Sequence, residues 1–384
     1  MIMNNEITVL RGPDRIRKRP AVVFTDDGIV GTTNAVKSLL RIFVGEAALG
    51  KCSKISFFEN QDGSFTVESF DKGFALGEKT VEGKPLWYYD FCEFFVPDEN
   101  PDDQFIFDTD SPSLYGEDEE IYQSIAGDPF FDITCVQFAT EFFNVEVLRN
   151  NTLKKLNFKK GYPRGELVKA PSKGESYTKI TFKLDSEVFK TSEILRDEIV
   201  SFLQITAAST PNLICEYTDI DKTHLTFNYP NGILDYIANH PETKQEIFEN
   251  EIGATGKDRY NKKDYSANLK VYVAPCKWWG FTLHIHNHER VDTPLSAPEK
   301  SLIKYFNWQI GSEANKKTDD KTVKENFCLI LESKCENTAT LWETARKQKI
   351  ANTMLINMSE DILNDDFGYW LKKNKETILK TFSE

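Results

Sequence analysis

The sequence predicts an α/β protein of two domains, in which helices are layered on mainly antiparallel strands. The chain has 384 residues, and a domain usually takes about 100–200. Its residues are 40% hydrophobic and 12% aromatic, which is enough for packed cores and excludes a disordered chain. Helix-like and strand-like patterns follow one another without the regular alternation that a parallel βαβ repeat would need.

The first helix is expected over 33–50, where apolar residues recur at three- and four-residue steps and a glycine follows. Two strands, 54–59 and 64–70, come next and are joined by an Asn-Gln-Asp-Gly turn, which is a hairpin signal. The other elements expected in this domain are helices at 133–143, 193–206 and 232–240 and strands at 145–149, 153–159, 178–183, 212–217 and 224–229.

A domain boundary is expected near residue 240, where the composition shifts toward Lys, Asn and Glu. The predicted domains are therefore 1–239 and 240–384. In the second domain we expect strands at 269–273, 281–288 and 327–333, a polar linker at 312–321, and helices at 341–357 and 370–382.

The charge of the chain argues against direct DNA binding. The formal net charge is −13, and residues 97–124 contain ten Asp or Glu and no Lys or Arg. A phosphate backbone needs a basic surface instead. The acidic segment is either a solvated loop or a surface that imitates DNA or docks a basic partner.

Other function classes are also disfavoured. No run of about 18 apolar residues occurs, so no contact with a membrane is expected. The seven cysteines are odd in number, scattered, and form no CxxC pair, which is typical of reduced thiols in a cytoplasmic protein. His284, His286 and His288 alternate, so a strand would place them on one face. They form either a polar strand face, which we favour, or a transition-metal site.

An ordered series of motifs resembles one protein family. The series runs through VLRG at 9–12, RKRP at 17–20, EAALGKC at 46–52, VESFDKG at 67–73, YTKITF at 177–182 and NGILDY at 231–236. In this order the motifs resemble the ATPase-plus-transducer region of the B subunits of DNA gyrase and topoisomerase IV, which belong to the GHKL family.

The resemblance implies both a fold and an activity. The fold would be a GHKL, or Bergerat-type, α/β sandwich over 1–239, followed over 240–384 by a transducer domain of the ribosomal-protein-S5-like α/β type. The family also has an ATP site with Mg²⁺, and it dimerises when nucleotide binds. Each of these properties has to be carried over residue by residue.

The catalytic residues of the family do not carry over. The general base, a glutamate, corresponds to Ser38, and the asparagine that holds Mg²⁺ corresponds to Ile42. Loss of a general base typically costs about 10²–10⁴-fold in rate, and isoleucine has no lone pair for a metal. A shifted register would place a working site elsewhere, but no Glu-x₃-Asn pair occurs within 33–50.

The nucleotide-binding residues carry over only in part. The adenine-reading aspartate corresponds to Ser69, whereas Gly73 and Thr178 are retained. The glycine-rich phosphate lid corresponds to 126–132, where Gly127 alone remains among Asp, Pro and Phe residues. The lysine that reaches the γ-phosphate would correspond to Lys347.

The sequence therefore predicts a vestigial nucleotide pocket in a gyrase-B-like pseudo-ATPase. We expect a dimerising interaction or regulatory protein rather than an enzyme, with no cofactor and no resident metal. Its partner would be a gyrase or topoisomerase subunit, or a second copy of the chain. The alternative is an ATP-hydrolysing subunit of a type II topoisomerase that works with a separate cleavage chain, and only this alternative requires ATP and Mg²⁺.

Overall fold

The structure is a computed structural model of the chain. It describes residues 10–78, 80–81, 83–93, 129–240, 247–257, 264–275, 282–291, 296–308, 320–335 and 353–381. The chain divides into two compact units: unit 1 runs to Leu203 and includes Leu213–Phe227, and unit 2 comprises Gln204–Asn212 and the chain from Asn228 onward. The units interleave along the sequence, and the boundary expected near residue 240 stays a prediction.

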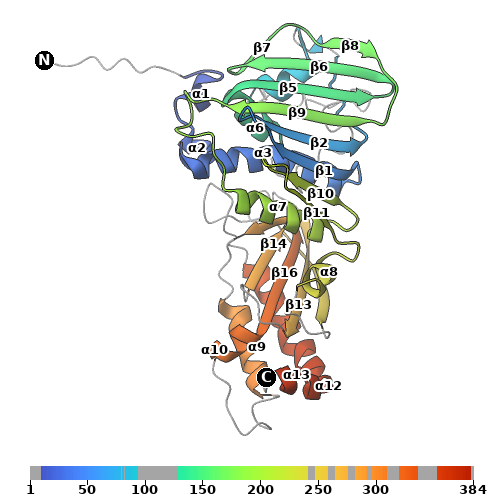
Figure 1. The fold of residues 1–384 in the computed structure, drawn as a ribbon. Coiled ribbons are helices and arrows are strands. Elements are labelled where there is room, and N and C mark those ends of the chain that lie inside the picture. Colours follow the sequence, from blue (N-terminus) through green and yellow to red (C-terminus); the bar gives the residue numbers. More distant parts are fainter. Residues whose placement is uncertain are drawn as a thin grey trace, which may run out of the picture. The chain divides into compact units, whose positions relative to one another are not determined.

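Unit 1 is built on a nine-stranded sheet with the order β11-β10-β1-β2-β9-β5-β6-β7, in which β8 also pairs with β6 (Figure 1). β1 and β10 run parallel, whereas β1, β2, β9, β5 and β6 are joined by antiparallel pairs. The strands are β1 (Cys52–Glu59), β2 (Phe65–Asp71), β5 (Thr140–Arg149), β6 (Thr152–Lys159), β7 (Tyr162–Pro163), β8 (Val168–Pro171), β9 (Tyr177–Leu184), β10 (Ile214–Thr218) and β11 (His224–Asn228). A separate ribbon pairs β3 (Thr80–Val81) with β4 (Lys84–Pro85).

The helices of unit 1 cover one face of this sheet. β9 alternates buried and half-exposed residues along its whole length, as a strand with one covered face should. α3 packs on β1 and on α6, and α6 packs on β5. The helices are α1 (Asp14–Arg17), α2 (Ala21–Phe24), α3 (Ile29–Ala48), α4 (Leu86–Cys92), α6 (Pro129–Phe138) and α7 (Arg196–Ser209), the last of which ends in unit 2.

Two helix boundaries in unit 1 differ from those expected. α3 begins at Ile29 because Asp26 Oδ1 accepts hydrogen bonds from the backbone N–H groups of Gly28 (2.8 Å) and Gly31 (2.7 Å), which fixes the start of the helix. The helix expected over 133–143 ends at Phe138, and β5 begins at Thr140. Pairing with β9 recruits the following residues into the sheet, so tertiary context overrides the helical pattern there.

Unit 2 has a five-stranded sheet with the order β12-β13-β16-β14-β15. β14 and β16 run parallel and the other pairs are antiparallel. The strands are β12 (Phe248–Lys257), β13 (Asp264–Pro275), β14 (Thr282–His286), β15 (Glu289–Val291) and β16 (Phe327–Cys335). The helices are α8 (Ile233–Ala238), α9 (Ser296–Phe306), α10 (Asp320–Asn326), α11 (Thr353–Ile362), the π-helical turn η4 (Leu363–Phe367), α12 (Gly368–Lys373) and α13 (Lys375–Thr381).

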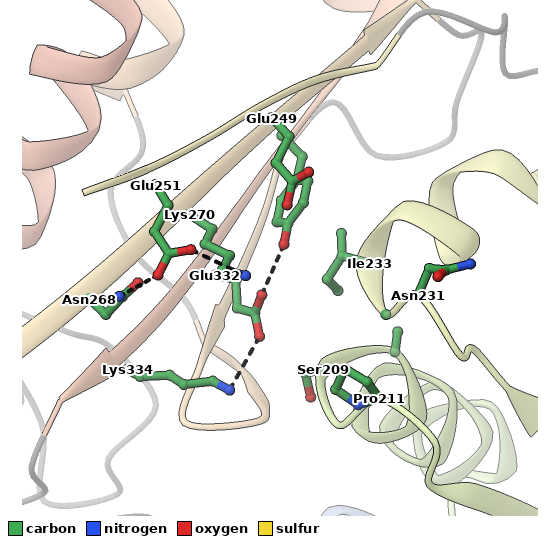
Figure 2. Close-up of a pocket in the computed structure, with 13 residues that line it drawn as sticks. Ser209, Pro211, Asn231, Ile233, Glu249, Glu251, Asn268, Lys270, Glu332 and Lys334 are labelled. Atoms are coloured by element: carbon green, nitrogen blue, oxygen red, sulfur yellow. Dashed lines mark hydrogen bonds and ion pairs between the residues drawn. The ribbon is translucent and has the colours of Figure 1, made fainter. Parts of the chain in front are cut away.

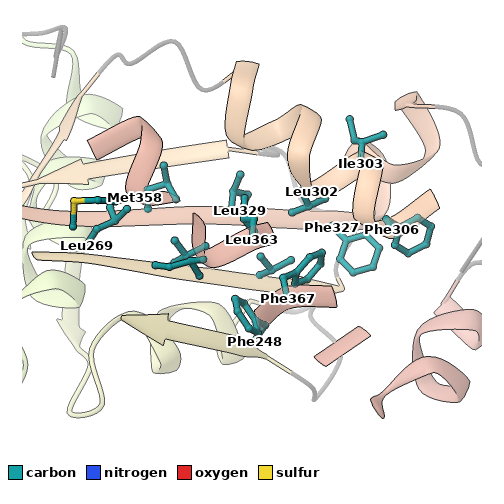
Figure 3. Close-up of a cluster of buried hydrophobic side chains, with 14 of the residues drawn as sticks. Phe248, Leu269, Leu302, Ile303, Phe306, Phe327, Leu329, Met358, Leu363 and Phe367 are labelled. Atoms are coloured by element: carbon teal, nitrogen blue, oxygen red, sulfur yellow. The ribbon is translucent and has the colours of Figure 1, made fainter. Parts of the chain in front are cut away.

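The core of unit 2 lies between one face of this sheet and its C-terminal helices (Figure 3). Leu302 on α9, Leu329 on β16 and Leu363 on η4 are all fully buried there. The helix expected over 370–382 is interrupted at Asn374, which separates α12 from α13. The acidic segment 97–124 and most of the linker expected at 312–321 lie outside the described residues. Within the described part of the chain, no helix is long and apolar enough to cross a membrane.

Candidate functional site

The two positions predicted for the catalytic base and the metal ligand lie on α3. Ser38 and Ile42 are both buried, and Ile42 has no exposed surface. The hydroxyl of Ser38 accepts a long hydrogen bond of 3.4 Å from Arg41 Nη1. The position predicted for the metal ligand thus carries a buried aliphatic side chain, and the position predicted for the base carries a hydroxyl beside a guanidinium.

The two residues predicted to meet adenine lie side by side in the sheet. Ser69 on β2 and Thr178 on β9 are direct cross-strand partners. Thr178 is completely buried, and its Oγ1 accepts a hydrogen bond of 2.8 Å from the backbone N–H of Phe74. The threonine hydroxyl is therefore already engaged by the protein's own backbone.

Gly73 allows the loop after β2 to lie against the sheet. Its φ of +68° is in the left-handed region, and a Cβ built there would lie 2.9 Å from the carbonyl oxygen of Tyr177. Its own carbonyl accepts a hydrogen bond of 3.3 Å from Arg149 Nη1. Both the conformation and the close approach require glycine at this position.

Aromatic rings fill the space between α3 and this loop. Phe43, which follows Ile42, stacks on Phe74, which follows Gly73, with ring centroids 5.4 Å apart and planes inclined by 17°. Both rings are essentially without exposed surface. Ala75 and Leu76 are also buried, and their carbonyl oxygens accept hydrogen bonds of 3.3 and 3.1 Å from Lys154 Nζ.

One network of contacts thus joins five of the seven residues predicted for the vestigial pocket. Ser38 and Ile42 lie on the helix that carries Phe43, and the Phe43–Phe74 stack leads to Gly73, Thr178 and Ser69. The other two, Gly127 and Lys347, lie outside the described residues. No sequence signal marked Phe43 and Phe74 as a pair, because they stand 31 positions apart and each alone is typical of a core residue.

The three histidines are buried but do not share a strand face. β14 ends at His286, and His288 lies in the hairpin turn with φ +71°. His284 Nε2 and His286 Nδ1 lie 2.7 and 2.8 Å from Ser333 Oγ, whereas His288 Nδ1 lies 2.9 Å from Thr210 Oγ1. Burial lowers the pKa of each imidazole to about 3. Among the described residues, no group of His, Cys, Asp and Glu is arranged to hold a metal ion.

A charged cavity of about 320 Å³ was not foreseen from the sequence. It lies in unit 2, where the polar face of the sheet meets the end of α7 and the start of α8 (Figure 2). Glu249 and Glu251 on β12, and Glu332 and Lys334 on β16, are each two positions apart, and that two-residue spacing was the available signal. β12 itself was missed because its Glu, Asn, Gly and Thr residues weaken the strand pattern.

Comparison with known proteins agrees with this architecture. The chain is 23% identical over 389 residues to the type 2 topoisomerase B subunit of Aquifex aeolicus, covering 98% of the chain and 46% of that relative. It is 23% identical over 382 residues to the DNA gyrase B subunit of Clostridium acetobutylicum, covering 97% of the chain and 56% of that relative. The chain resembles the B subunits of type II DNA topoisomerases over nearly its whole length. No family model matches the chain.

Solved structures show the same fold. The ATPase domain of Thermus thermophilus gyrase B, solved in complex with an aminocoumarin, matches with a TM-score of 0.64 and 18% identity, covering 96% of this chain and 93% of that one. The gyrase B structure from Myxococcus xanthus matches with a TM-score of 0.66 and 13% identity, covering 96% and 99%. The mixed α/β architecture is thus that of gyrase B ATPase-region structures. The gyrase-B-like chain spans about half the length of the curated relatives it matches.

Proposed function

We propose that this gyrase-B-like chain is a pseudo-ATPase, a dimerising interaction or regulatory protein that works alongside type II topoisomerases without turning over ATP. The observation that carries the proposal is the filled space beside α3. Phe43 and Phe74 stack where the loop after β2 approaches the helix, and the Thr178 hydroxyl is held by the Phe74 N–H. A nucleotide would have to separate two buried rings and share the Thr178 hydroxyl with the Phe74 N–H.

The chemistry of the pocket residues supports the same interpretation. Ser38 cannot remove a proton from water at neutral pH without a base beside it, and its nearest described partner is the cationic Arg41. Ile42 offers no ligand to Mg²⁺, whose charge is needed to neutralise a triphosphate during phosphoryl transfer. The residues that shape the loop and sheet, Gly73 and Thr178, remain because they hold the fold together.

The test is calorimetric titration of the full chain with ATP·Mg²⁺ and with a non-hydrolysable analogue. We expect no saturable heat from either ligand and no phosphate release. The matched variant is Ser38→Glu/Ile42→Asn, which restores the family residues but leaves both phenylalanines in place, so it too should fail to bind. Micromolar binding by the wild type, lost in Thr178→Val, would contradict the proposal.

The alternative is an ATP-hydrolysing subunit that works with a separate cleavage chain. It is favoured by the names of the relatives, which are subunits of DNA gyrase and DNA topoisomerase 4. This alternative requires phosphate release by the wild type, stimulated by DNA in the presence of the cleavage subunit.

For the regulatory role, the partner can be tested directly. The chain is added in increasing amounts to a purified gyrase from the same cell, and supercoiling is measured. We expect a dose-dependent change in supercoiling without ATP consumption by the added chain. A chain that changes neither gyrase nor topoisomerase IV activity and co-elutes with neither enzyme would contradict a topoisomerase partner. That result would leave a second copy of the chain as the remaining candidate.

A further inference from the structure

The cavity in unit 2 is lined by three carboxylates and two ammonium groups. Glu249 and Glu251 come from β12, Lys270 from β13, and Glu332 and Lys334 from β16. Each lysine forms an ion pair with one of these carboxylates. Lys270 Nζ lies 3.4 Å from Glu251, and Lys334 Nζ lies 3.8 Å from Glu332. These contacts leave one acidic charge in excess inside the cavity.

Glu332 is the most deeply buried of the three carboxylates. It is only 8% exposed, and burial raises the pKa of its carboxyl group. One oxygen accepts a hydrogen bond of 3.2 Å from the Tyr272 hydroxyl, and the other has Lys334 at a distance too long for a hydrogen bond. The charges of Lys334 and Lys270 both favour the ionised form of Glu332. Among the described residues Tyr272 supplies its only hydrogen bond, so the second carboxylate oxygen can still accept one.

Glu249, the cross-strand partner of Tyr272, adds a second acceptor to the lining of the cavity. It is exposed toward the cavity, and its carboxylate has no hydrogen bond or ion pair with any residue that the structure describes. α7, a helix of 14 residues, ends at Ser209 on the opposite wall, and the carbonyl end of a helix favours positive charge.

The opposite wall offers an apolar surface. Pro211 and Ile233 lie across the cavity from the Glu332 carboxylate (Figure 2), and Ala208 also lines the cavity. A short alkyl chain fits such a wall, while its charged end reaches the carboxylates. The volume of about 320 Å³ is at the lower end of the range for small-ligand pockets.

We infer that this cavity binds an organic cation, an ammonium or guanidinium group on a short alkyl stem. The cation lies between Glu332 and Glu249, and the stem packs on Ile233 and Pro211. Such a group is found both in free alkyl amines and in the arginine or lysine side chain of a protein. The inference does not depend on the proposed loss of ATP turnover, because the cavity shares no residue with the pocket beside α3.

Agmatine, which carries a guanidinium and an ammonium group on a butyl stem, is the probe. It is titrated into the full chain at low ionic strength by calorimetry. We expect saturable binding that weakens at least about ten-fold in Glu332→Gln and measurably in Glu249→Gln. Glu68→Gln, which removes a carboxylate paired with Lys179 on the polar sheet face of unit 1, is the matched control and should bind as the wild type does.

Two results would overturn the inference. One is no saturable heat with the wild type up to about 10 mM agmatine. The other is undiminished binding in Glu249→Gln, which alters an exposed residue and should fold normally even if Glu332→Gln does not. N-acetyl-arginine amide then identifies the source: binding comparable to that of agmatine indicates a protein side chain, and binding of agmatine alone indicates a free amine.

Discussion

Single residues around Gly73 hold the loop after β2 against the sheet. Arg149 and Lys154 donate to carbonyl oxygens of the loop at Gly73, Ala75 and Leu76. These two cationic side chains therefore fasten the loop to the sheet. Each of these hydrogen bonds from a charged donor contributes about 1.5–3 kcal/mol when it is shielded from water.

Gly73 provides a direct test of one such residue. Gly73→Ala forces a methyl group against the Tyr177 carbonyl at a left-handed backbone position, so we expect a loss of at least about 3 kcal/mol of unfolding free energy. Gly63→Ala is the control, because Gly63 has φ +74° but open space around its Cβ position. That variant should lose about 1–2 kcal/mol in urea unfolding. Equal losses in the two variants would mean that the close approach contributes nothing.

The N-terminal motif that is retained from the family also has a structural explanation. Arg17 Nη2 forms an ion pair of 2.7 Å with Asp185, and Nη1 donates to the carbonyl of Phe138. The motif thereby fastens α1 to the ends of α6 and β9. Burial opposes the charge of Asp185, but its hydrogen bonds with the Glu187 N–H and with Arg17 keep the pKa of this carboxyl below its usual value.

At the scale of secondary structure, the pairing of β14 with β16 buries His284 and His286. The pKa of His284 and His286 is lowered to about 3 by burial, whereas an unfolded histidine has a pKa near 6.5. Between these values the unfolded chain binds more protons than the folded chain. The free energy of unfolding therefore falls as the pH drops below about 6.5.

This pH dependence is measurable by urea unfolding at pH 7.5 and 5.0. Each buried histidine should account for about 2 kcal/mol of the stability lost between these two pH values. His286→Asn should therefore be less stable at pH 7.5 but lose about 2 kcal/mol less on acidification. His224→Asn alters an exposed histidine on β11 and serves as the control. A pH profile for His286→Asn that parallels the wild type would contradict the neutral, buried state of this imidazole.

At the scale of the whole molecule, the fold is that of the gyrase B ATPase-region structures. The chain spans about half the length of its curated relatives, so the activities of the complete relatives are not assigned to it. If nucleotide does not bind, it cannot control association of the chain.

Light scattering tests this consequence. Under the proposed loss of nucleotide binding, we expect the same molar mass with and without a non-hydrolysable ATP analogue and Mg²⁺. The analogue should also leave the thermal unfolding midpoint unchanged, whereas a ligand at 100 times its Kd would add about 2.7 kcal/mol of stability. A monomer that becomes a dimer only with the analogue would instead favour the working ATPase.

Most of the fold was predictable from local pattern. The strands at 54–59, 153–159 and 178–183 were expected within two residues of their observed bounds, because alternation reports directly which face is buried. Elements with mixed composition were not predicted: β12 and α9 were missed, and the helix expected over 133–143 continued into a strand. In each case a partner strand or a packed neighbour, absent from local sequence, decides the conformation.

The order of residues along the chain was enough to predict which side chains correspond to the family's pocket positions, with Ser38 and Ile42 expected in place of a base and a metal ligand. What surrounds them became clear only from the folded chain. Folding brought Phe43 onto Phe74, gave the Thr178 hydroxyl a backbone donor, and placed Glu249 and Glu332 in one cavity. This division arises because periodicity records how much a residue is buried, whereas its neighbours depend on contacts between segments far apart in the chain.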